Sequence, residues 1–270
     1  MTPAALLHRF HSLAPWLDLE TTVDRIIIGD PAVEVSRLVV TWMSTFDACR
    51  AAVERDCQLI VTHEPTFWSH RDELATSGAV AHPVWQAAFA RKRQFIQDHG
   101  LVILRCHDVW DFFPEIGIPF AWARFLGLGS APAALSENRS LHRYDIAPLT
   151  VDDLARRVAA KTATLGEPAV QIVGDGSRLV SRIGVGTGCY CNPVEMQALG
   201  CDLSIVCDDG NWYWENLQCA ADSDHPLIRV NHGTSEEPGM RSLADYLART
   251  FPDLTVEFLP HGSCFRLVGV

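Results

Sequence analysis

The stretch Cys57-Gln-Leu-Ile-Val-Thr-His63-Glu64-Pro65-Thr-Phe-Trp68 decides the fold of the N-terminal half. Its apolar run, Leu59 to Val61, is rich in β-branched residues and predicts a buried strand. Pro65 has no backbone N–H, so the pairing ends there. His63 and Glu64 therefore stand just beyond the carboxyl end of a strand, where open α/β sheets gather their ligands. The stretch predicts half of a metal site.

Two further predicted strands end on pairs of candidate ligands, and in each pair the two residues are four positions apart. These strands and pairs are 101–106 with His107 and Asp111, and 227–230 with His232 and Glu236. At the last of these sites a strand becomes a helix, so a spacing of four lets both side chains face one cavity.

The six candidate ligands are three imidazoles and three carboxylates, without a cysteine. Such a mixed set suits Zn, Fe, Mn or Co better than calcium, which prefers oxygen ligands, or a thiolate zinc finger. Six ligands exceed the need of one tetrahedral ion, which favours two metals sharing a bridging carboxylate or hydroxide. Metals about 3.5–4 Å apart lower the pKa of a bridging water and hold both oxygens of a displacement.

Composition excludes several other classes of protein. The chain has 270 residues, 48% of them hydrophobic, and a formal charge of −11, which argues against a nucleic-acid or anionic-membrane binder. Nine cysteines without a regular spacing indicate reduced thiols. The N-terminus does not fit a signal peptide, and no apolar run reaches the roughly 18 residues of a membrane span. We therefore expect a cytoplasmic protein that binds neither membrane nor nucleic acid.

Strands and helices alternate along the chain, which predicts α/β architecture. Helices are expected over 45–55, 82–99 and 236–250, with a linker at 130–140. The sequence also predicts a polar loop over 69–77 and a last strand over 264–268.

Three weaker motifs leave alternatives open. The glycines at 184, 186 and 188 favour a tight turn over a phosphate loop, because the full dinucleotide spacing is missing. Cys189 and Cys191 favour two packed thiols over a soft-metal site. Proton transfer could involve Glu195, Asp208 or Glu215, which the sequence does not distinguish; the catalytic residue is not assigned.

The sequence resembles the family of hexameric dinuclear metal-centre proteins called NIF-three-like, or type 2 homologues of GTP cyclohydrolase I. The resemblance spans nearly the whole chain. It rests on Ile60-Val-Thr-His63-Glu64-Pro65, on His107-x-x-x-Asp111 followed by Pro-Glu-Ile-Gly, on 120–128, and on Asn231-His232-Gly-Thr-Ser-Glu236.

The resemblance implies roles for particular residues. His63, Asp111, His232 and Glu236 match family metal ligands, and His107 matches a histidine that lines the site. Glu64 departs from the pattern, because the family usually has a second histidine there. A carboxylate adds negative charge and hardens the site, which tilts the preference toward Mn or Fe relative to Zn.

The resemblance also implies a fold and a function. We expect an α/β protein of two intertwined lobes with mixed sheets and a metal site between them. The first lobe would be 1–130 with 227–270 packed against it, and the second 140–226. Subunits would form a homohexamer, and two divalent transition metals (Zn, Fe or Mn) would support a cyclohydrolase-like cleavage of a C–N or phosphoester bond in an unknown small molecule. The alternative is a non-catalytic metal-binding module with a regulatory or protein-interaction role.

Overall fold

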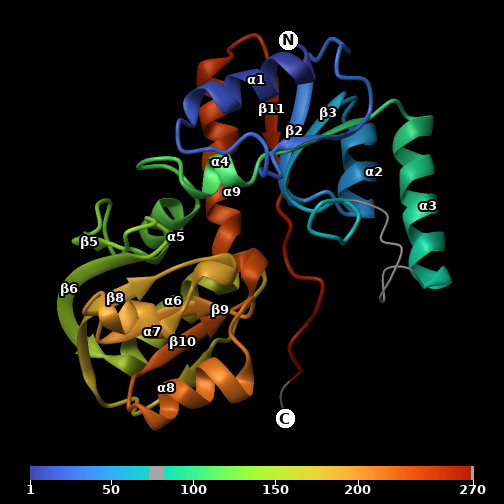
Figure 1. Cartoon of the computed structure of the whole chain (residues 1–270). Helices are drawn as coiled ribbons and strands as arrows, with labels where there is room; N and C mark the ends of the chain where they lie inside the picture. Colours follow the sequence, from blue (N-terminus) through green and yellow to red (C-terminus); the bar gives the residue numbers. More distant parts are fainter. Residues whose placement is uncertain (73–81, 269–270) are drawn as a thin grey trace. The chain divides into compact units, whose positions relative to one another are not determined.

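The computed structural model describes residues 1–72 and 82–268, which form two compact units (Figure 1). Unit 1 comprises Met1–Phe113 and Met240–His261, and unit 2 comprises Pro114–Gly239 and Gly262–Val270. Each unit holds one mixed sheet with helices, so the prediction of an α/β protein with mixed sheets is confirmed. The boundaries of these units differ from those of the expected lobes. The division into the expected lobes stays a prediction. Residues 73–77 of the predicted loop lie outside the described residues.

Unit 1 contains a five-stranded sheet in the order β1-β4-β3-β2-β11. The strands are β1 (Arg25–Ile28), β2 (Arg37–Met43), β3 (Leu59–Glu64), β4 (Val102–Arg105) and β11 (Thr255–Phe258). β1 is antiparallel to β4, and the other pairs are parallel. Because Ile60 pairs with Ile103 in register, the carboxyl ends of β3 and β4 meet at one edge, which brings the residues that follow them together.

Helices cover both faces of this sheet (Figure 1). α2 (Phe46–Glu54) and α3 (Pro83–Asp98) lie on one side, and α1 (Pro3–Leu13) with the later part of α9 (His232–Thr250) lies on the other. The apolar layer under α2 and α3 includes Val39, Cys49, Ala52, Ile60, Ile96 and Ile103. A short helix, α4 (Asp108–Asp111), follows β4 directly.

Unit 2 contains a six-stranded sheet in the order β5-β6-β8-β9-β10-β7. The strands are β5 (Ala134–Leu135), β6 (His142–Thr150), β7 (Gln171–Val173), β8 (Leu179–Val185), β9 (Leu203–Cys207) and β10 (Leu227–Val230). The central strands β8, β9 and β10 run parallel, and the outer pairs are antiparallel. The fully buried β9 and the largely buried β10 point their carboxyl ends toward the start of α9.

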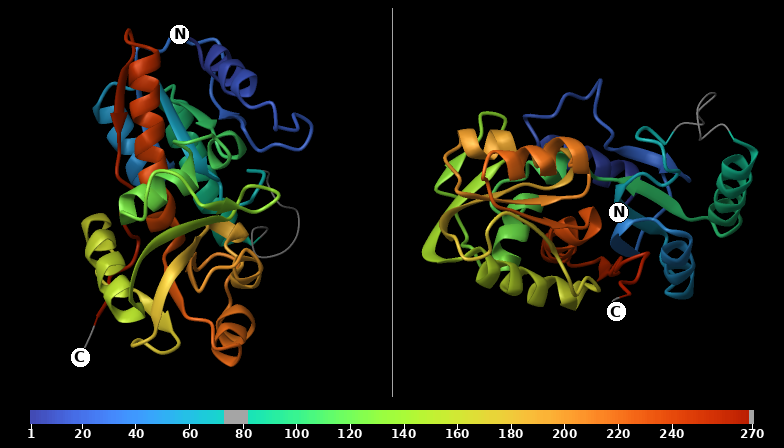
Figure 2. Two further views of the ribbon diagram at one scale, coloured as in Figure 1. Left: turned by 90° about the vertical axis from the view of Figure 1, so that its left-hand side faces the viewer. Right: turned by 90° about the horizontal axis from the view of Figure 1, so that it is seen from below.

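Helices also pack on both sides of the second sheet. They are α5 (Ile118–Leu126), α6 (Val151–Thr162), α7 (Pro193–Ala198) and α8 (Gln218–Asp222), with a π-helical turn at Tyr213–Leu217. Figure 2 shows α6 on one side of the sheet and α8 on the other. The Thr150 side chain accepts the N–H of Asp153 and caps α6, as a threonine at that position predicts.

Three elements differ from the sequence-based expectation. Residues 264–268 form no strand, because this segment is exposed and pairs with no other strand. The expected linker at 130–140 contains β5. β6 was not predicted, because only His142 and Tyr144 along it are buried and its apolar pattern is weak. In the part of the chain that the structure describes, no helix has both the length and the apolar character to span a bilayer.

Candidate metal centre

The end of β3 carries His63 in a fully buried position. Its Nδ1 lies 3.2 Å from the carbonyl oxygen of Cys106, an acceptor that fixes the ring proton on Nδ1. The other nitrogen, Nε2, lies 3.4 Å from Oδ1 of Asp111. Ligating histidines typically donate one N–H to a carbonyl and offer the second nitrogen to the metal. His63 therefore has the arrangement of a ligand.

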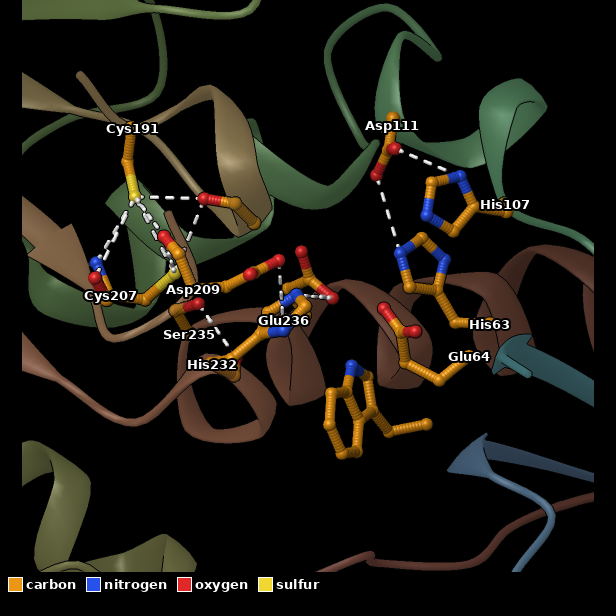
Figure 3. A network of polar contacts seen from close by, with 12 residues as sticks. His63, Glu64, His107, Asp111, Cys191, Cys207, Asp209, His232, Ser235 and Glu236 are labelled. Atoms are coloured by element: carbon orange, nitrogen blue, oxygen red, sulfur yellow. Dashed lines mark hydrogen bonds and ion pairs between the residues drawn. The ribbon is translucent and has the colours of Figure 1, made fainter. Parts of the chain in front are cut away.

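One turn of α4 places His107 and Asp111 on the same side. The rings of His63 and His107 stack with centroids 4.3 Å apart and an interplanar angle of 13°. Oδ2 of Asp111 lies 3.3 Å from Nδ1 of His107. One potential ligand atom from each of the three residues lies within 4.8 Å of the other two, and Figure 3 shows Asp111 beside both rings. The spacing of four between His107 and Asp111 thus has the geometry that the sequence suggested.

Carboxylates that the sequence did not single out hold the loop before α4. Asp24, 2% exposed, accepts the backbone N–H groups of His107 and Val109. Asp108 accepts the Thr22 hydroxyl at 2.7 Å and lies 2.9 Å from Nδ1 of His107. These bonds orient the His107 ring from behind, in the manner of supporting residues around metal ligands.

Burial and charge shift the pKa values of this group. Burial raises the pKa of Asp24. For Asp108, burial opposes ionisation, but the hydrogen bonds from His107 and Thr22 outweigh it and lower the pKa far below its ordinary value. For His107, burial favours the neutral ring, but the Asp111 carboxylate outweighs it and raises the pKa. The carboxylates of Asp111 and Asp108 therefore favour positive charge at His107, as expected beside a cation site.

Glu64 ends β3 next to His63 (Figure 3). Its Oε2 lies 4.0 Å from Nη2 of Arg105, whose guanidinium also donates to the carbonyl oxygen of His63 at 2.7 Å. Arg105, at the end of β4, thereby contacts both the backbone of His63 and the side chain of Glu64 at the end of β3. The assignment of Glu64 as a ligand stays a prediction.

Unit 2 holds a second imidazole–carboxylate pair at the start of α9. Nε2 of His232 lies 3.0 Å from Oε2 of Glu236, one helical turn later (Figure 3). Glu236 is only 2% exposed. The N–H of His232 donates to Asp208 at 2.6 Å, and Oδ2 of Asp209 lies 3.7 Å from Nδ1 of the ring. The helix begins at His232 itself, four residues earlier than expected.

Gly188 closes one side of this pair. It has a φ of +56°, and a Cβ there would lie 3.2 Å from Oε1 of Glu236 and 3.5 Å from Nε2 of His232. Gly184 and Gly186, by contrast, pack against apolar and sulfur-containing side chains. The three glycines thus serve close packing, and the last one makes room for the pair.

The two packed thiols in this unit are Cys191 and Cys207, with Sγ atoms 3.5 Å apart, whereas Cys189 is exposed. The expected partner of Cys191 was therefore wrong, because the neighbouring strand β9 supplies it. Burial raises the pKa of Cys207 well above its ordinary value. Burial also acts on Cys191, but hydrogen bonds from Cys207 outweigh it and lower the pKa.

The donor chemistry of these groups fits a divalent transition metal. Each unit contributes imidazole nitrogen and carboxylate oxygen, the ligands that suit Zn, Fe and Mn. Of the three residues considered for proton transfer, Asp208 contacts a candidate ligand, whereas Glu195 and Glu215 are exposed at α7 and the π-helical turn. Sequence reasoning missed Asp24 and Asp108, and it expected only a tight turn at Gly188. Asp108 had a signal in the sequence, its position beside His107, whereas Asp24 lies far from every motif and had none.

The fold and these side chains define a two-unit α/β protein with candidate metal-ligand groups of histidine and carboxylate. Residues 5–262 match the Duf34/NIF3 (NGG1p interacting factor 3) family, and the chain belongs to that family. The resemblance stated from the motifs is confirmed.

Curated relatives and a solved structure agree with this assignment. The "GTP cyclohydrolase 1 type 2 homolog" of Chlamydia pneumoniae is 21% identical over 235 residues, covering 83% of this chain and 84% of the relative. The protein of the same name from Pseudomonas aeruginosa is 24% identical over 221 residues, covering 81% of each. The crystal structure of hypothetical protein SA1388 of Staphylococcus aureus matches with a TM-score of 0.79 at 17% identity, covering 99% of each chain. That likeness supports the fold alone.

Proposed function

We propose that the protein is a metal-dependent hydrolase of the cyclohydrolase type, cleaving a C–N or phosphoester bond. His63, Glu64, His107, Asp111, His232 and Glu236 would hold two divalent ions (Zn, Fe or Mn). When bound, such ions supply a water of lowered pKa and polarise the bond to be cleaved. The names of the curated relatives support a cyclohydrolase over other hydrolases.

The observation that carries this proposal is the convergence of His63, His107 and Asp111 within 4.8 Å. In this group, neighbouring residues already hold the candidate ligands in position. Cys106 holds the His63 proton on Nδ1, so that Nε2 keeps its lone pair. Asp24 and Asp108 hold the loop that presents His107. A group organised in this way binds a cation with little rearrangement.

The test is elemental analysis of protein purified without chelators, followed by anomalous scattering to count the ions. We expect two ions per chain in the native protein and fewer in His63→Ala and in His232→Ala. Turnover is then measured on a panel of nucleotides, cyclic amides and phosphodiesters. Metal-dependent turnover that His232→Ala abolishes supports the enzyme. A fully loaded protein that is inert on the whole panel supports the alternative, a non-catalytic metal-binding module.

Glu64 decides the number of ions in this proposal. We propose that its carboxylate binds the second metal, where most relatives would use a histidine. Glu64→Ala should then lower the metal-to-protein ratio from two toward one, read by elemental analysis. An unchanged ratio in a folded variant would contradict this role.

We also propose a homohexamer, as the resemblance to the family implies. Mass photometry of the purified protein should give six times the chain mass of 29.9 kDa. A monomer or dimer at physiological salt would contradict this assembly without affecting the metal-site proposal.

A further inference from the structure

A cavity of about 400 Å³ lies in unit 1, outside the group formed by His63, His107 and Asp111. It lies beyond the carboxyl end of β2, between α2 and α3, on the sheet face that these helices cover. Ligands of open α/β sheets gather beyond the carboxyl ends of parallel strands. The lining residues are Met43, Thr45, Phe46, Arg50, Trp68, Ala88, Arg91 and Lys92.

The lining of this cavity is strongly cationic. Its described lining residues include Arg50, Arg91 and Lys92 and no carboxylate, in a chain whose net charge is −11. Arg50 forms an ion pair with Asp47, which is exposed at the first turn of α2. Among the residues that the structure describes, Arg91 forms no ion pair, and its guanidinium carbon lies 5.0 Å from the Phe46 ring centroid. At least one guanidinium is therefore available to an anion.

Lys92 lines the cavity and is buried, with 2% of its surface exposed. Its Nζ donates to the carbonyl oxygen of Thr66 at 2.7 Å and lies 5.4 Å from the centroid of the Trp68 ring. No carboxylate of the described chain lies within 4 Å of this Nζ. Removing an ammonium from water without an ion-pair partner costs free energy, and an anion in the cavity would offset that cost.

Aromatic rings form the rest of the wall. Phe46 carries the guanidinium groups of both Arg50 and Arg91 within about 5 Å of its centroid. Trp68 has a φ of +62°, a conformation that a bulky L residue rarely adopts. Strain of this kind persists where the surrounding structure fixes a side chain, often at ligand sites.

We infer that this cavity binds an organic phosphate that carries an aromatic ring, with Arg91, Arg50 and Lys92 holding the phosphate and Trp68 or Phe46 stacking on the ring. Arginine forks match phosphate oxygens in pairs, and aromatic faces stack on planar groups. The volume lies within the 300–1,000 Å³ of ordinary small-molecule pockets. This inference goes beyond the proposed hydrolase, since none of the residues involved is a proposed metal ligand.

The test is calorimetric titration of the full-length protein with three probes: phenyl phosphate, inorganic phosphate and uncharged phenyl glucoside. Phenyl phosphate should bind with a Kd near or below about 1 mM, inorganic phosphate at least several-fold more weakly, and the glucoside not measurably. Equal binding of the two phosphates would refute the aromatic part of the inference. Lack of binding by both would refute the site.

Variants on α3 give a matched control. Arg91→Gln should weaken phenyl phosphate at least tenfold. Arg93→Gln removes the same charge two residues along the helix, outside the cavity lining, and should change the Kd less than twofold. Lys92→Met should weaken binding without lowering the metal content. If Arg91→Gln and Arg93→Gln have equal effects, the binding is unspecific charge attraction and the site is refuted. Thermal unfolding of Arg91→Gln and Lys92→Met, compared with the native protein, checks that the fold is intact.

Discussion

The two units present imidazole and carboxylate groups in different ways. In unit 1, the candidate ligands come from the ends of two adjacent strands, and Asp24 and Asp108 fix the loop before α4. In unit 2, His232 and Glu236 are one turn apart on a single helix, Gly188 lies beside them, and two buried thiols contact the carbonyl oxygen of that glycine. The first group depends on tertiary pairing of strands, whereas the second is local. A disturbance of the pairing between β3 and β4 should therefore separate the residues of the unit 1 group, but it should leave His232 and Glu236 one helical turn apart.

The largest effect should come from Asp111, which lies within 3.4 Å of a nitrogen of both His63 and His107. Asp111→Asn keeps the shape but removes the charge between the two rings. We expect metal affinity to fall more than 100-fold, above the roughly 10–100-fold typical of losing a supporting group. Asp108→Asn, in the same helix, should lower metal affinity by an amount within that 10–100-fold range. Competition with a chelating dye measures both. Equal losses would mean that Asp111 is only a supporting residue.

Each unit also has its own buried basic group, and the two groups make the free energy of unfolding depend on pH in different ranges. Burial lowers the pKa of Lys92 in unit 1 from 10.5 to about 8, and that of His142 in unit 2 from 6.5 to about 4. Between the folded and unfolded values, the unfolded chain binds more protons. Stability therefore rises with pH over about 8–10.5 through Lys92 and over about 4–6.5 through His142. Each contribution is at most about 3.4 kcal/mol.

Two variants test these windows separately. Lys92→Met should remove the rise in unfolding free energy above pH 8, and His142→Gln the rise below pH 6.5, as read by urea denaturation at a series of pH values. Because the chain has only two lysines, Lys92 and the exposed Lys161, lysine-labelled NMR can follow the Lys92 titration directly. Two lysine signals titrating together near 10.5 would contradict the assignment.

Local sequence patterns were enough to predict most of both groups but not what surrounds them. β3 and β4 were expected because their apolar runs are nearly continuous, and the four-residue spacing of His107 and Asp111 survives as a short helix. Asp24 lies 83 residues from His107 in sequence, and only the pairing of β1 with β4 brings it close. β6 was not predicted, because its sequence lacks the alternation of apolar and polar residues that marks a strand. Its pairing with β8 places it in the sheet. The expected strand over 264–268 had apolar residues but no partner.

A smaller effect should follow from filling the space beside His232. Gly188→Ala places a methyl group 3.2 Å from Glu236 in a left-handed conformation, which costs about 1–2 kcal/mol for the backbone alone. Gly262→Ala is the matched control, since Gly262 has a φ of +64° and nothing within 4 Å of its added Cβ. Both variants should lose similar thermal stability, but only Gly188→Ala should lose metal affinity, by about tenfold or 1.4 kcal/mol. Similar affinities in both would show that Gly188 does not border the ligands.

The smallest effect should be a change of metal preference at Glu64. Replacing its carboxylate by imidazole removes a hard, charged donor, and imidazole ranks zinc above manganese more strongly than a carboxylate does. Glu64→His should therefore raise the zinc-to-manganese affinity ratio by up to about tenfold, while His232→Ala in the other unit should lower the affinity for both ions. Glu20→His makes the same substitution at an exposed position of unit 1 and controls for the lost charge. Competition between the two ions, read by elemental analysis, gives the ratio. If Glu64→His and Glu20→His shift it equally, Glu64 acts through the net charge of unit 1 and not as a ligand. In that case Arg105, 4.0 Å away, is its partner, and the ligands of unit 1 are His63, His107 and Asp111 alone.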